Sequence, residues 1–95
     1  MEIKAMNQPL AGRQFRFLVA GGTRPTRIQV YIDQSQVASK DCDDPPCHEI
    51  VWIPPGTRGS EVRIVASNLL GSTEERRFTI ADAEASGGGM MSAGG

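Results

Sequence analysis

The residues of this 95-residue chain that could do chemistry gather in one short segment, Lys-Asp-Cys-Asp-Asp-Pro-Pro-Cys-His-Glu, at positions 40–49. Cys42 and Cys47 are its two cysteines, and the prolines between them favour a turn that brings the thiols together. We expect a disulfide in an oxidising compartment, contributing roughly 2 kcal/mol through loop closure. Two free thiols in a cytosolic loop remain an alternative. Redox chemistry is disfavoured, because Cys-x-x-Cys spacing at a helix start is missing.

The same segment could in principle bind haem or a metal ion. Cys42-x4-Cys47-His48 resembles an expanded form of the Cys-x-x-Cys-His haem attachment motif. The chain has few spare apolar residues for a haem pocket, so we expect no cofactor. A zinc site needs four converging ligands, usually from two separated pairs, and the second pair is missing. Asp43 and Asp44 are therefore interpreted as solvated loop acids, and no metal is expected.

Catalysis by the one histidine, His48, would need a nucleophile brought to it by the fold. Its neighbour Cys47 points to the opposite side if the local chain is extended. We therefore interpret His48 as a loop residue without a role, and we expect no enzymatic activity.

The remaining chain reads as short strands separated by turn residues. Apolar residues alternate with polar ones in residues 13–20, 27–33, 61–68 and 73–80, which is typical of half-buried strands. A first edge strand should end near Pro9, a short edge strand should start near Val37, and residues 49–53 form an apolar run between prolines. The expected core residues are Phe15, Phe17, Val19, Ile28, Val30, Ile32, Ile50, Val62, Ile64, Ala66, Phe78 and Ile80.

About seven such runs without any helical period predict an all-β fold, an antiparallel β-sandwich over residues 1–82. Residues 83–95, rich in Gly, Ser and Ala, are expected to form a flexible tail or linker, disordered from about Ser86. A domain of this size buries only about 60–65% of its unfolded surface, so its stability should be marginal.

One face of the central strands carries residue types that are enriched at interfaces. Tyr31, Arg63, Arg77 and Glu75 share this face if residues 27–33, 61–68 and 73–80 are adjacent, and Arg27 lies on it too. The first interpretation is a partner-binding surface. The second is cross-strand ion pairing of Arg63 and Arg77 with Glu75 and Asp33. Such pairing contributes a few tenths of a kcal/mol per pair.

Trp52 is the one tryptophan, and alternation places it on the same side as Ile50. This predicts a core position. The neighbouring prolines could instead rotate the indole outward, where it would offer a flat platform for a sugar.

Two local patterns carry a family resemblance. Ile53-Pro54-Pro55-Gly56-Thr57 resembles the Leu-x-Pro-Gly-Thr corner of fibronectin type III domains, and Ala66-x-Asn68-x-x-Gly71 resembles the end of the strand that follows in fibronectin type III and immunoglobulin-like domains. The tyrosine of that corner is replaced by Ser60, and the early-strand tryptophan of fibronectin domains is replaced by Phe15 and Phe17. The inter-sheet cysteine pair and core tryptophan of antibody-type domains are also absent. The resemblance implies a broad immunoglobulin-like sandwich.

Charge and hydropathy narrow the functional classes. The net charge of −1 gives no basic field for nucleic acid, and no apolar run is long enough for membrane insertion. The N-terminus has no signal peptide, so an exported location needs a leader or parent chain. We expect a non-catalytic spacer, adhesion or protein-interaction module of an extracellular, periplasmic or cell-surface protein. It is expected to be a monomer or part of a larger chain, with a protein or acidic glycan as partner. The alternatives are a carbohydrate-binding module and a thiol or haem protein.

Overall fold

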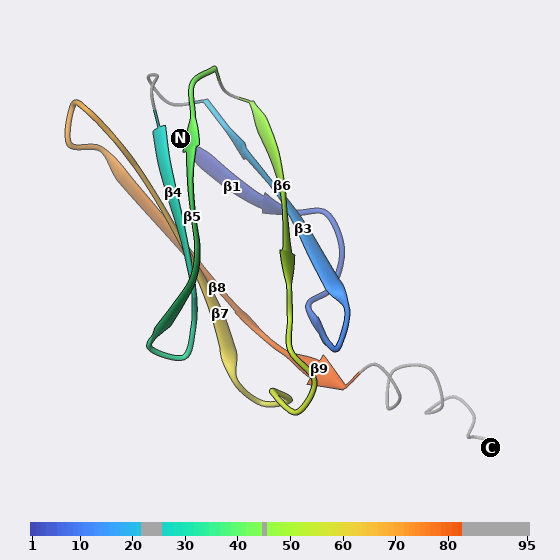
Figure 1. The fold of residues 1–95 in the computed structure, drawn as a ribbon. Helices are drawn as coiled ribbons and strands as arrows, with labels where there is room; N and C mark the ends of the chain where they lie inside the picture. The colour runs from blue at the N-terminus through green and yellow to red at the C-terminus, as the bar shows by residue number, and fades with distance from the viewer. Residues whose placement is uncertain (22–25, 45, 83–95) are drawn as a thin grey trace.

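The computed structural model describes residues 1–21, 26–44 and 46–82. Within these residues the chain forms strands and no helix (Figure 1). The strands are β1 (Glu2–Ala5), β2 (Leu10–Ala11), β3 (Gln14–Ala20), β4 (Thr26–Ile32), β5 (Ser35–Cys42), β6 (Cys47–Trp52), β7 (Glu61–Asn68), β8 (Thr73–Thr79) and β9 (Ala81–Asp82).

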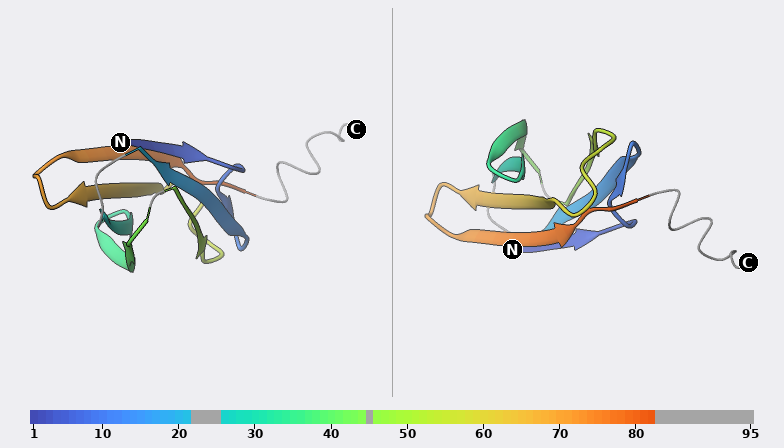
Figure 2. Two further views of the ribbon diagram at one scale, coloured as in Figure 1. Left: turned by 90° about the horizontal axis from the view of Figure 1, so that it is seen from above. Right: turned by 90° about the horizontal axis from the view of Figure 1, so that it is seen from below.

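The strands form two packed antiparallel sheets, which confirms the predicted all-β sandwich (Figure 2). One sheet has the order β1-β3-β6 and the other has the order β5-β4-β7-β8. The two-residue strands β2 and β9 pair in parallel at one end of the molecule, a contact that the sequence did not predict. Residues 83–95 lie outside the described residues, so the expected tail stays a prediction.

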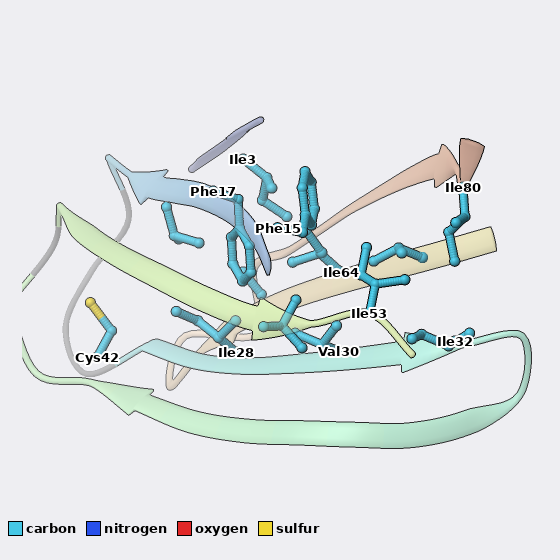
Figure 3. Close-up of a cluster of buried hydrophobic side chains, with 14 residues drawn as sticks. Ile3, Phe15, Phe17, Ile28, Val30, Ile32, Cys42, Ile53, Ile64 and Ile80 are labelled. Atoms are coloured by element: carbon cyan, nitrogen blue, oxygen red, sulfur yellow. The ribbon is translucent and has the colours of Figure 1, made fainter. Parts of the chain in front are cut away.

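The core lies between the two sheets and follows the period-2 pattern of the strands. Phe15 lies 5.9 Å from Phe17 and 5.5 Å from Phe78, measured between ring centroids. Phe15, Phe17 and the aliphatic side chains around them form one buried cluster (Figure 3). Of the predicted core, all but two residues are buried. Phe78 is partly buried and packs against the cluster, whereas Ile50 lies outside it.

Ile50 was assigned to the wrong face of its strand. The run Glu-Ile-Val-Trp-Ile is apolar at four consecutive positions, so it contains no alternation that fixes which side is inward. In the structure Val51 and Ile53 are buried, while the side chains of Ile50 and Trp52 are 50% and 54% exposed. The predicted core positions of Ile50 and Trp52 are therefore both wrong.

The prediction that residues 40–48 form a loop is also partly wrong. β5 runs from Ser35 to Cys42, and β6 already begins at Cys47, so both cysteines lie in strands. β5 is the short edge strand that was predicted near Val37, but its extension to Cys42 was missed, because the strand is polar and has little apolar alternation. A β-bulge near Val37 further interrupts its register with β4.

The two sheets are tied to each other along both sides of the sandwich. On one side the Arg76 guanidinium of β8 donates a hydrogen bond to the Ile3 carbonyl of β1 at 3.0 Å and stacks over the Phe78 ring. On the other side β5 and β6 are joined by the Cys42–Cys47 disulfide and by an ion pair between Lys40 and Glu49 at 3.8 Å.

Candidate interaction surface

Tyr31, Arg63 and Arg77 form a row across the outer face of the four-stranded sheet. Tyr31 on β4 is the cross-strand partner of Arg63 on β7, and Arg63 is in turn the partner of Arg77 on β8. The residues on either side of Tyr31 and Arg63 along their strands are Val30, Ile32, Val62 and Ile64, which point into the core. Strand alternation therefore holds the row on the solvent side, as the sequence predicted.

Glu75 links the row from within. The Arg63 guanidinium lies 4.5 Å from the centre of the Tyr31 ring, a cation–π contact. Its Nη1 atom lies 3.6 Å from Glu75 Oε1. The Arg77 Nε donates a 2.7 Å hydrogen bond to the other carboxylate oxygen, Oε2. One carboxylate thus bridges two guanidinium groups, and these four side chains are the interaction row.

The two arginines set the ionisation of this cluster. The hydrogen bond from Arg77, together with the positive charges of Arg77 and Arg63, lowers the pKa of Glu75 below its usual range. The same carboxylate raises the pKa of Arg77. Both effects favour the charged forms, so the cluster is ionised at neutral pH.

The predicted ion pairing is therefore present at Glu75 but absent at Asp33. The Asp33 carboxylate instead accepts a 3.3 Å hydrogen bond from the Glu61 backbone N–H. Exposed pairs of this kind contribute little to stability, but they restrict the side-chain rotamers. The Arg77 side chain remains 58% exposed. The row ends in a surface depression lined by Asp33, Gln34 and Glu61 together with the two arginines.

The predicted disulfide between Cys42 and Cys47 is present, with a Cα–Cα distance of 6.2 Å. Cys42 is buried at the end of β5, and Cys47 is partly buried at the start of β6. Because these strands belong to different sheets, the bond ties the sandwich together rather than only a loop. A disulfide is consistent with an oxidising, extracytoplasmic location.

The remaining chemical candidates are His48, Asp43 and Asp44. His48 is exposed on the outer face of β6, and it is the cross-strand partner of Leu18. Asp43 and Asp44 lie in the bend after β5. Among the described residues no group of three or more His, Cys, Asp or Glu side chains is placed to hold a metal ion.

Two exposed apolar features were not predicted, apart from the outward alternative that was given for Trp52. The first is on the outer face of the three-stranded sheet, where Met6, Ile50 and Trp52 are about half exposed. This patch could have been predicted by assigning Val51 and Ile53 to the core, because Ile53 adjoins the corner that follows the strand. The alternation of β6 then places Ile50 and Trp52 on the outer face.

The second feature is the tip of the β7–β8 hairpin, where Leu69 and Leu70 are 79% and 76% exposed. The Asn68 side chain accepts hydrogen bonds from the backbone N–H groups of Leu70 and Ser72, at 3.0 and 3.1 Å. Gly71 closes the turn with a φ of 89°, a conformation that glycine adopts without a steric penalty. The turn therefore has a defined shape although its leucines contact solvent.

Comparison with known proteins leaves the family open. No protein-family model matches the chain, and no curated protein matches it significantly. The described residues contain no helix long and apolar enough to cross a membrane.

Proposed function

We propose that the chain is a non-catalytic immunoglobulin-like module of an exported or cell-surface protein, and that it acts as a protein-interaction domain. The strand order supports the immunoglobulin-like assignment. With β3 to β8 taken as strands B, C, C′, E, F and G, the four-stranded sheet has the order C′-C-F-G and the other sheet has the order A-B-E. In immunoglobulin-type sandwiches B and E likewise lie in one sheet, and C, F and G in the other.

The observation that carries the interaction role is the pre-organised row of Tyr31, Arg63 and Arg77. Tyrosine and arginine dominate the binding energy of many protein interfaces. Here the aromatic ring and Glu75 already hold Arg63, and Glu75 holds Arg77. Since these rotamers are restricted before binding, the side chains of the row lose less conformational entropy when a partner contacts them. The row lies on three hydrogen-bonded strands, which are more rigid than loops.

The chemistry of the row favours a partner with exposed carboxylates, either a protein or an acidic glycan. Two guanidinium groups share one carboxylate, so the four side chains of the row keep a net positive charge, with Asp33 and Glu61 beside them at one end. Arginine can pair with a second carboxylate through its remaining N–H groups. Contacts of this kind weaken as the ionic strength rises.

The test replaces both ends of the row in one variant. Tyr31→Ala combined with Arg77→Ala should keep the melting temperature within a few degrees, because both residues face solvent. It should lose the partner that the wild-type domain captures from a surface-protein extract, and its retention on an acidic-glycan column should fall. Arg27→Ala is the matched control, since it removes one guanidinium that is paired with Asp41 on the same face. Unchanged capture by the double variant would refute the proposal.

A carbohydrate-binding module is the second candidate, and the exposure of Trp52 favours it. An indole on a sheet surface can stack on a sugar ring. However, its exposed apolar neighbours are Ile50 and Met6, which are aliphatic rather than aromatic. Binding would change the fluorescence of Trp52, the single tryptophan, on titration with polysaccharides. A saturable change would favour this function over protein binding.

A further inference from the structure

The sheet edges of the described residues differ in how they are protected against pairing with another strand. Edge strands are usually blunted by inward-pointing charges, bulges or short length. β8 points Arg76 inward and lies beside β1, a four-residue strand. β5 is polar and bulged. β6 has one inward-pointing charge, Glu49, but this carboxylate is already paired with Lys40 of its own chain. Unlike β5 and β8, β6 also carries large apolar side chains, the half-exposed Ile50 and Trp52, on its outer face.

The backbone of β6 offers a defined set of free groups at this edge. The Ile53 N–H donates to the Arg13 carbonyl at 3.0 Å, and the Ile53 carbonyl accepts from the Gly12 N–H at 2.8 Å. Backbone groups alternate in direction along an antiparallel ladder, so those of residues 47, 49 and 51 point toward β3 as well. The N–H and C=O groups of His48, Ile50 and Trp52 consequently point away from the sheet.

Proline limits this free edge at both ends. The next residues in the same phase as His48 and Trp52 are Pro46 and Pro54, which have no N–H to donate. The free donors are thus those of residues 48, 50 and 52. Ile50 lies at the centre of this set.

We propose that a second copy of this chain pairs with β6 in antiparallel orientation, with Ile50 of each copy on the two-fold axis. His48 then faces Trp52 of the other copy, Ile50 faces Ile50, and Trp52 faces His48. Each facing pair exchanges two backbone hydrogen bonds, about six in all. The two three-stranded sheets become one continuous sheet across the dimer, and the interface is self-complementary, as two-fold symmetry requires.

The neighbouring registers are less favourable. Sliding the axis to Glu49 places two carboxylates directly opposite each other and sets Trp52 against Pro46. Sliding it to Val51 sets His48 against Pro54, which cannot donate. With Ile50 at the centre, Glu49 faces Val51 instead, and it keeps its ion pair with Lys40 of its own chain.

The apolar surface of β6 supplies the hydrophobic part of this interface. The outer face of the pair brings two isoleucines together and packs each indole beside an imidazole. Met6 shares a surface depression with Ile50 and His48 and extends the patch. Pairing over five residues is a small interface, so we expect a dissociation constant on the order of a millimolar.

The first test measures the mass of the protein against concentration by analytical ultracentrifugation. The wild type should shift from monomer to dimer as its concentration approaches the millimolar range. Ile50→Lys should remain monomeric with an unchanged melting temperature. Val37→Lys is the matched control, because Val37 is 42% exposed on β5, the edge of the other sheet, and its variant should dimerise like the wild type. A wild type that is monomeric throughout, or equal dimerisation of Ile50→Lys, overturns the proposal.

The second test fixes the register by cysteine cross-linking under mild oxidation. Ile50→Cys should form a covalent dimer with itself, because facing residues of a hydrogen-bonded pair have Cα atoms about 5.5 Å apart, within disulfide reach. His48→Cys and Trp52→Cys should each cross-link poorly alone but efficiently when mixed. Equal cross-linking of all three single variants would indicate random collision and overturn the register. The dimer is independent of the interaction row, so the Tyr31→Ala, Arg77→Ala variant should still dimerise.

Discussion

At the scale of single residues, Glu75 shows how position on a strand determines what a charge does. It lies two residues before Arg77 on β8, on the same face, and diagonally opposite Arg63 on β7. This places one carboxylate within reach of both guanidinium groups. The cluster therefore follows from strand alternation and register alone.

The lowered pKa of Glu75 predicts a specific pH dependence. The native state binds this proton less readily than the unfolded chain, so the ion pairs stabilise the fold above the ordinary pKa of 4.5. That contribution is lost as the pH falls through the lowered value. Glu75→Gln should therefore destabilise the protein slightly at neutral pH and make its melting temperature less sensitive to acid.

Thermal melts between pH 3 and pH 7 would check this. Glu74→Gln is the control, since it removes the same charge one residue away on the opposite face of β8. If the melting temperature falls equally steeply with acid in the Glu75→Gln variant and in the wild type, the expectation is contradicted.

At the scale of elements, β6 is where the sequence and the structure disagree most. The strands β3, β4 and β7 and their inward faces were predicted correctly, because each alternates apolar and polar residues over at least five positions. β6 has a continuous apolar run instead, and its inward phase is determined by the corner that follows it, where Ile53 is buried. β5 is polar, so only its beginning near Val37 was predicted and not its length. The β2–β9 contact joins two residues to two others far along the chain, so it has no local signal.

The corrected phase of β6 predicts opposite outcomes for two adjacent substitutions. Val51→Asn places an amide in the core without partners, which should cost roughly 2–4 kcal/mol and largely unfold a marginal domain. Ile50→Asn changes a half-exposed side chain and should cost less than about 1 kcal/mol. Urea unfolding, followed by circular dichroism, compares the two. Equal losses of stability would show that the phase assigned to β6 is incorrect.

The candidate site was predicted in part. Tyr31 and Arg63 were placed on one face because they lie on strands with clear alternation. Glu75 and Arg77 lie on the polar strand β8, and their face follows from Phe78 and the next residue in phase, Ile80, at its end. The apolar patch around Trp52 was missed, because it depends on a strand whose phase the local sequence leaves undetermined.

At the scale of the whole molecule, the disulfide links the two sheets covalently. Cys42 and Cys47 are only five positions apart, but they belong to edge strands of different sheets. Closing this short loop should contribute roughly 2 kcal/mol in the chain-entropy model. For a domain of this size that corresponds to about 10 °C in melting temperature.

Replacing both cysteines by alanine should therefore lower the melting temperature by about this amount. Wild-type protein melted in the presence of a reductant should behave similarly, which separates the loss of the bond from the cavity left at Cys42. An unchanged melting temperature in both experiments would show that the bond contributes nothing to the fold.

The parallel pair of β2 and β9 has a mechanical consequence. The first residue of β1 and the end of β9 lie at opposite ends of the sandwich (Figure 1). A pulling force applied to these two points runs along the strands, and it loads the short contact between Leu10–Ala11 and Ala81–Asp82 in shear. Hydrogen bonds in shear must break together, whereas those in a hairpin pulled open break one by one. Under tension, this small contact would therefore resist first. It would break before β8 separates from β7.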